Sequence, residues 1–144
     1  MKELLKNKVA IVTGGGRGIG RGHSLHLAKS GAAVLVNDID SEEAKKVVKE
    51  ILNEGGVAKT SSLDISSREG CSLLIDECVS EFGNIDILVN NAGVLRDKSL
   101  LKMTDEDFDY VWNIHVKGTF WSSQLAALKM KESGKGGSII NTTS

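Results

Sequence analysis

The chain has 144 residues, of which 40% are hydrophobic and 26% charged, and this composition fits one soluble domain spanning residues 1–144. Its 18 basic and 19 acidic residues give a net charge of -1 and form no long block of one sign. This balance excludes a strongly basic surface for nucleic acid or membrane lipids, so the expected partners are small molecules and other protein chains.

Apolar runs and helical patterns alternate along the chain. Five short runs rich in Val and Ile predict buried strands at 8–13, 32–38, 57–63, 85–91 and 137–144. Helical patterns occupy 20–30, 40–53, 67–82 and 105–130. Regular alternation of this kind predicts right-handed crossovers and a doubly wound parallel α/β sheet, covered by helices on both faces.

The helical patterns also predict which side chains are buried. The helix at 40–53 is expected to bury Ala44, Val47, Val48, Ile51 and Leu52. The helix at 105–130 is expected to bury most of Phe108, Val111, Trp112, His115, Phe120, Leu125 and Leu128.

The cysteines and the N-terminus predict a reducing compartment. Cys71 and Cys78 lie within one helical pattern without further ligands nearby, so we expect buried structural cysteines and no metal site. The apolar run near the N-terminus is short and broken by glycine, which is typical of neither a signal peptide nor a membrane span. We therefore expect a cytoplasmic protein, with peroxisomal and mitochondrial locations left open.

A glycine-rich loop follows the first expected strand. Six glycines stand among the eleven residues from Val12 to Gly22. A strand, such a loop and a helix beginning near Gly18 present free N–H groups and a positive helix end to a pyrophosphate. Gly20 is followed by Arg21, not by the Lys of a Walker loop. The loop therefore predicts a dinucleotide site, and a tight turn made for packing alone is the alternative.

Asp38, at the end of the second expected strand, strengthens this prediction. It stands eighteen residues after Gly20, where a carboxylate accepts hydrogen bonds from the adenosine ribose and repels a 2′-phosphate. We therefore expect the cofactor to be NAD, preferred over NADP, with Arg17 softening that preference. A solvated turn residue is the alternative for Asp38.

Four motifs, in chain order, resemble those of the short-chain dehydrogenase/reductase family. They are TGGGRGIG (13–20), LDI (63–65), NNAG (90–93) and GSIINTTS (137–144). The resemblance covers essentially the whole chain. It implies a three-layer α/β/α Rossmann-like fold, and an oxidoreductase that transfers hydride between NAD(H) and a secondary alcohol or ketone as small-molecule substrate.

The resemblance also assigns site residues. In the glycine motif the cofactor-binding residues are Thr13, Gly14, Gly16, Arg17, Gly18, Ile19 and Gly20. Asp64 matches the adenine contact and is followed by Ile65, and the segment under the cofactor ribose is Asn90, Asn91, Ala92 and Gly93. Ser144 falls at the catalytic serine, which stabilises the substrate oxygen as charge develops. Thr143 takes that place if the register is shifted by one.

One departure from the family pattern lies at His115, three residues before Gly118, where the family usually has Asn. With His115 at this position, the segments GRGHSLHLA and IHVKGTF resemble one branch of the family. That branch contains the (3R)-hydroxyacyl-CoA dehydrogenase domain of multifunctional β-oxidation enzymes. Less similar versions of these segments occur in 3-oxoacyl-carrier-protein reductases. For His115, a catalytic role as proton relay and a packed helix histidine are both open.

A second departure is the missing YxxxK pair, whose Tyr moves the proton and whose Lys lowers the Tyr pKa in the family. The only tyrosine is Tyr110, which precedes the serine position and has Ile114, not Lys, four residues later. The resemblance thus implies the N-terminal part of a dehydrogenase domain, truncated after the fifth strand. We expect this part alone to be inactive and the full-length form to be a homo-oligomer.

Three interpretations are consistent with these features. The first is part of an NAD-dependent dehydrogenase that acts on a secondary alcohol, such as a 3-hydroxyacyl thioester. The second is a non-catalytic dinucleotide-binding module, and the third is a non-functional gene fragment that aggregates through the apolar fifth strand. We favour the first because it accounts for every motif.

Overall fold

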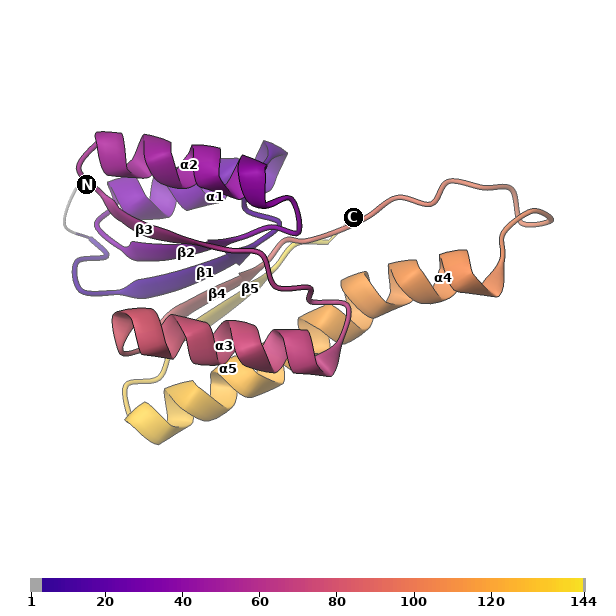
Figure 1. Cartoon of the computed structure of the whole chain (residues 1–144). Helices are drawn as coiled ribbons and strands as arrows, with labels where there is room; N and C mark the ends of the chain where they lie inside the picture. Colours follow the sequence, from indigo (N-terminus) through magenta and orange to yellow (C-terminus); the bar gives the residue numbers. More distant parts are fainter. Residues whose placement is uncertain (1–3, 144) are drawn as a thin grey trace.

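The computed structural model describes residues 4–143 (Figure 1). The strands are β1 (Val9–Thr13), β2 (Ala33–Asn37), β3 (Val57–Ser61), β4 (Ile87–Asn90) and β5 (Ser138–Asn141). The helices are α1 (Gly18–Lys29), α2 (Ser41–Asn53), α3 (Arg68–Phe82), α4 (Asp105–Trp112) and α5 (Thr119–Ser133), with the π-helical turn η1 (Asn113–Gly118) between the last two. All strand pairs are parallel, in the order β3-β2-β1-β4-β5. The predicted fold class is confirmed.

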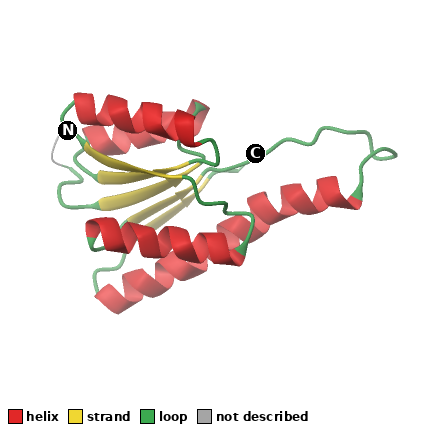
Figure 2. Cartoon of the chain, in the orientation of Figure 1, coloured by secondary structure: helices red, strands yellow, loops and turns green. Residues whose placement is uncertain are grey.

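The sheet lies between two helical layers (Figure 2). Helices α1 and α2 cover one face, and α3 and α5 cover the other (Figure 1). Successive side chains of a strand point to opposite faces, so β1 contributes to two cores. Val9 and Ile11 pack with α3 and α5, whereas Ala10 and Val12 pack with α1 and α2. The central strand is therefore buried along its whole length.

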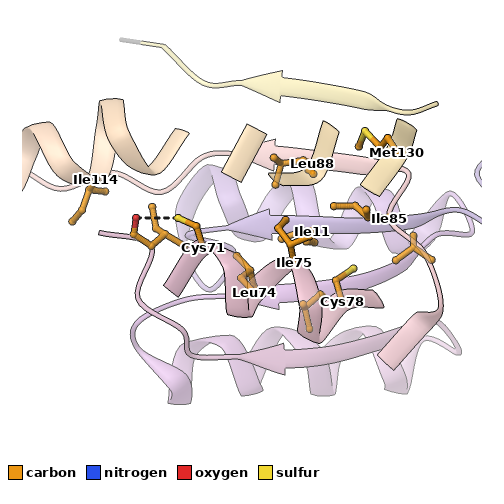
Figure 3. Packing of buried hydrophobic residues seen from close by; sticks show 13 residues of the cluster. Ile11, Cys71, Leu74, Ile75, Cys78, Ile85, Leu88, Ile114 and Met130 are labelled. Atoms are coloured by element: carbon orange, nitrogen blue, oxygen red, sulfur yellow. Dashed lines mark hydrogen bonds between the residues drawn. The ribbon is translucent and has the colours of Figure 1, made fainter. Parts of the chain in front are cut away.

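Both cysteines belong to the core between the sheet and α3 (Figure 3). Cys71 and Cys78 are buried and free, and the Cys71 thiol donates to the Ile65 carbonyl at 3.4 Å. Burial raises the pKa of Cys71, and it raises the pKa of Cys78 to about 12. Both thiols are thus protonated at neutral pH, as suits structural cysteines.

The described residues meet the requirements of neither a metal site nor a membrane-spanning helix. Within residues 4–143, His, Cys, Asp and Glu side chains form no cluster of three or more that could hold a metal ion. None of the helices in that range combines the length and the apolar character that crossing a bilayer requires.

The helical stretch at 105–130 is present, but its predicted buried side is mostly wrong. Phe108, Trp112, His115, Phe120 and Leu128 are exposed, and Val111 and Leu125 are half-buried. The residues that face the core are instead Ile114, Gly118, Ser122, Ala126 and Met130. Leu52 of α2, also predicted to be buried, is 52% exposed.

Small side chains explain this reversal. Gly118, Ser122 and Ala126 recur every four residues on the inner side, where they let the helix approach the sheet and α3 closely. The large apolar side chains consequently lie outside. Phe108, Trp112, Val116 and Phe120 form an exposed row, which we name the apolar stripe.

Gly20 holds α1 close to the glycine loop. A Cβ atom at this position would lie 1.9 Å from the carbonyl oxygen of Gly14, so no side chain fits there. Gly22 lies in the same helix, yet a Cβ atom at that position would meet nothing within 4 Å. The close approach that shapes the loop therefore depends on Gly20 and not on Gly22.

We predict opposite effects for Gly20→Ala and Gly22→Ala. The first should lower the free energy of unfolding by about 2 kcal/mol, because loop and helix must move apart. The second should raise it by about 0.5 kcal/mol, because Ala favours a helix over Gly. Urea unfolding followed by circular dichroism measures both values. Equal effects of the two variants would contradict this account of the loop.

Strand β5 forms one edge of the described sheet, and all four of its residues are exposed. Its centre is apolar, since Ile139 and Ile140 are 36% and 47% exposed. The opposite edge strand, β3, carries Lys59. Charge on an edge strand discourages pairing with other chains, so β5 is the edge at risk of aggregation.

We predict that Ile140→Lys raises the concentration at which the chain stays monomeric, because it adds charge to the apolar edge. Val57→Lys on β3 is the matched control, since that edge already has a lysine, and it should have a smaller effect. Light scattering against protein concentration compares the two. An equal gain from both variants would mean that overall charge, not the β5 edge, limits solubility.

Candidate functional site

A cleft of about 420 Å³ opens at the carboxyl ends of the strands. Eleven residues predicted from the sequence line it: Gly14, Arg17, Gly18, Ile19, Gly20, Asp38, Asp64, Ile65, Asn91, Ala92 and Gly93. A larger hollow, of about 580 Å³, lies where α1 and α2 end, against Lys29 and Glu54. We place the candidate site in the smaller cleft, because three separate motifs of the sequence meet there.

The N-terminus of α1 borders this cleft and has no side-chain cap. Its N-cap residue, Arg17, makes no capping hydrogen bond, and its first turn contains no acidic residue. Helices α2, α3 and α4 differ, because Asp40, Ser67 and Thr104 cap them and acidic residues stand in their first turns. Free N–H groups and an uncompensated helix dipole attract an anion. The start of α1 is therefore suited to a phosphate group.

Asp38 is held in place by backbone groups. Its Oδ2 accepts from the Gly16 N–H and its Oδ1 from the Asp40 N–H, both at 3.0 Å. Gly16 itself is buried and does not line the cleft. A Cβ atom there would lie 2.8 Å from Asp38 Oδ2, so Gly16 allows the loop to meet this carboxylate. Each oxygen keeps a lone pair for a further donor.

Arg17 is paired with two carboxylates of the α2 N-terminus. Its Nη2 lies 2.5 Å from Asp40 Oδ2, and its Nε lies 3.5 Å from Glu43 Oε2. Lys46 also binds Glu43, at 2.5 Å. The hydrogen bond from Lys46 lowers the pKa of Glu43, and the charge of Arg17 acts in the same direction. Glu43 is therefore charged at neutral pH.

Thr13 and Asn90 lie behind the cleft and connect its parts. Thr13 Oγ1 accepts from the N–H groups of Asn91 and Ala92, each at 3.0 Å. The Asn91 side chain donates to the carbonyls of Thr13 and Gly14, both at 3.2 Å. Asn90 Nδ2 lies 2.9 Å from Asn141 Oδ1 on β5. Thr13 and Asn90 thus shape the cleft without lining it.

Asp64 and Ile65 form the wall beyond β3. Asp64 is exposed, and its Oδ1 accepts from the Ser66 N–H at 2.9 Å, whereas Ile65 is buried. Among the described residues, no basic side chain forms an ion pair with Asp64. Ile39 adds an apolar surface that is 69% exposed. A carboxylate beside exposed apolar side chains suits a flat ring that carries an amino group.

His115 contacts the segment after β4. Its Nε2 lies 2.9 Å from the Val94 carbonyl oxygen and 3.0 Å from the Val94 nitrogen, and its ring is next to Gly93. The side chain does not line the cleft. The predicted catalytic serine, Ser144, lies outside the described residues. The structure thus brings most of the predicted cofactor residues together around the cleft, while His115 does not line it.

Six residues of the lining were not predicted: Asn37, Ile39, Leu63, Val94, Tyr110 and Ile114. Leu63 belongs to the LDI motif, and Asn37, Ile39 and Val94 each adjoin a predicted residue, so the rule that ligands bind at carboxyl ends of strands would have included all four. Tyr110 and Ile114 come from α4 and η1, across the cleft. In the sequence, only their spacing of one helical turn connects these two residues. Arg96 stacks on the Tyr110 ring at 4.7 Å.

Comparison with known proteins identifies relatives over nearly the whole chain. The family profile described as short chain dehydrogenase matches residues 8–144. Peroxisomal multifunctional enzyme A of Dictyostelium discoideum is 43% identical over 96% of this chain and 33% of that protein. Peroxisomal hydratase-dehydrogenase-epimerase of Saccharomyces cerevisiae is 45% identical over 97% of this chain and 15% of that protein. A 3-oxoacyl-[acyl-carrier-protein] reductase of Thermotoga maritima is 36% identical, over 97% and 56%.

Solved structures agree with these relatives. A 7α-hydroxysteroid dehydrogenase complexed with NADH and 7-oxo glycochenodeoxycholic acid matches with a TM-score of 0.92 and 41% identity, over 97% of this chain and 54% of that one. A short-chain type dehydrogenase/reductase from Mycobacterium marinum has a TM-score of 0.93 and 36% identity, over 97% and 57%. The chain thus spans little more than half of these proteins. The resemblance found in the motifs is confirmed, and the chain belongs to the short-chain dehydrogenase/reductase family of oxidoreductases.

Proposed function

We propose that this chain binds NAD(H) in the cleft, as the N-terminal part of a dehydrogenase acting on a secondary alcohol or its ketone. The observation that carries the proposal is the uncapped N-terminus of α1, beside the glycine loop and Asp38. When bound, the cofactor supplies or accepts the hydride. The residues of this chain hold and orient it.

Each part of the cleft suits one part of the dinucleotide. The first turn of α1 would bind the pyrophosphate through N–H groups, and Gly18, where a Cβ atom would face open space, leaves room for it. Asp38 would accept from the ribose hydroxyls, since backbone bonds already fix its position. Asp64 would accept from the adenine amino group. Repulsion between Asp38 and a 2′-phosphate supports the preference for NAD over NADP.

The substrate class we propose is a 3-hydroxyacyl thioester. Support comes from the resemblance around His115 and from the names of relatives, which include a multifunctional peroxisomal enzyme and a 3-oxoacyl-carrier-protein reductase. Ser144 would stabilise the substrate oxygen. His115 would contribute by holding Val94 and thus the rim of the cleft, and a proton relay through it stays the alternative.

We further propose that the 144 residues alone bind cofactor without turnover. Acid–base catalysis in the resembling family needs a Tyr and a Lys four residues later, and the only tyrosine here, Tyr110, lies on α4 with Ile114 at that spacing. The apolar stripe supports a homo-oligomeric full-length form, because exposed apolar rows mark contacts between proteins. A cytoplasmic location stays a prediction, with the peroxisome as the alternative.

We predict that the chain binds NADH and that Asp38→Asn weakens this binding about tenfold, the effect of one charged hydrogen bond. Asp76→Asn, which removes an exposed carboxylate on α3, is the control and should not change affinity. Fluorescence titration measures binding, and NADH production from NAD and 3-hydroxybutyryl-CoA measures turnover. Failure to bind NADH would refute the cofactor site, and measurable turnover would refute the predicted inactivity.

The catalytic part of the proposal has a separate test at the level of the gene. Sequencing the transcript beyond the Ser144 codon should reveal an in-frame YxxxK. If a stop codon follows Ser144 and the product accumulates in cells, a cofactor-binding module without catalysis is the better interpretation.

A further inference from the structure

We propose that Asp40 and Glu43 are specificity-determining residues, which favour NAD over NADP by keeping Arg17 from binding a 2′-phosphate. This inference rests on the proposed cofactor site. It adds a second device to the repulsion by Asp38, and it locates that device on α2, outside the residues that line the cleft.

Arg17 is the residue of this cleft best able to bind a phosphate. It lines the cleft together with Asp38, the residue next to which the 2′ position of the ribose is expected. A guanidinium offers five N–H donors in a planar fork that matches phosphate oxygens. Left without partners, Arg17 would therefore offset the repulsion from Asp38 and admit NADP.

In the structure Arg17 has acidic partners instead. Asp40 Oδ2 accepts a hydrogen bond from Arg17 Nη2 at 2.5 Å, and Glu43 Oε2 lies 3.5 Å from Arg17 Nε. Both contacts lie on the edge of the guanidinium that carries Nε and Nη2. A 2′-phosphate that binds this edge would have to displace the two carboxylates, and their charges would repel a phosphate near any part of the guanidinium.

The acidic partners are themselves fixed, so they can hold Arg17 in one place. Asp40 caps α2, with its Oδ1 accepting from the N–H groups of Glu42 at 3.2 Å and Glu43 at 3.3 Å. Glu43 is held from its other side by Lys46. Carboxylates are also favoured at this helix end by the helix dipole. The pairing therefore does not depend on long, freely rotating side chains on both sides.

The double variant Asp40→Ser/Glu43→Gln tests this inference in the complete 144-residue chain. Ser retains a helix cap and Gln retains the length of Glu, while both charges next to Arg17 are removed. The matched control is Glu42→Gln/Glu50→Gln, which removes two charges from the same helix that pair with Lys45 and Arg21. NADH and NADPH are titrated by fluorescence, and thermal unfolding verifies that each variant is folded.

We expect the ratio of the NADPH Kd to the NADH Kd to fall about tenfold in the double variant, since Arg17 gains a charged hydrogen bond to phosphate. The control should keep the natural ratio. Adding Arg17→Gln to the double variant should restore it.

An unchanged ratio in the double variant, an equal fall in the control, or a fall that survives Arg17→Gln would each overturn the inference while leaving the cofactor site standing. If the natural chain binds neither dinucleotide, the proposed function fails and this inference fails with it.

Discussion

Five hydrogen bonds join the end of β1 to β4 and the segment that follows it, and the position of the whole cleft depends on them. The Thr13 hydroxyl uses its one donor and both acceptors in this junction, so it is fully satisfied although it is buried. The chain leaves β1 toward β2 and β3 on one side and returns to β4 on the other. Where the connections from two adjacent strands run in opposite directions, a crevice opens at the carboxyl ends of the strands. The junction fixes the width of that crevice, with the glycine loop on one side and Asn91 on the other.

The sequence predicted most of the fold because most of its signals are local. Asp40 and Ser67 mark the starts of α2 and α3, and the apolar runs place every strand within a few residues of its observed bounds. The inner face of α5 was missed for a physical reason. Apolar content favoured Phe120, whereas the distance between helix and sheet selects Ser122 and Ala126, and that distance is a property of the packed structure.

The same distinction applies to the candidate site. The glycine loop and Asp38 were predictable because each follows a strand whose direction the alternation already implies. Tyr110 reaches the cleft from a helix that begins beyond a long connection, so no local pattern signals it. The pairing of Arg17 with Asp40 joins residues 23 positions apart, and charge patterns along a sequence do not show such pairs. The charge of Arg17 alone was visible in the sequence, and only the structure shows where it is directed.

The π-helical turn η1 has a geometric consequence for the wall of the cleft. A turn closed by i→i+5 hydrogen bonds accommodates one residue more than an α-helical turn. Each α-helical residue advances the helix face by about 100°, so η1 rotates α4 by about that angle relative to the face it would present in an uninterrupted helix with α5. The turn thus works as a one-residue insertion that keeps Tyr110, Ile114 and Gly118, each four residues apart, on the inner side of the helix. One side of this long helix therefore serves two purposes, since Tyr110 and Ile114 both pack on the core and line the cleft, so a substitution at either position changes both.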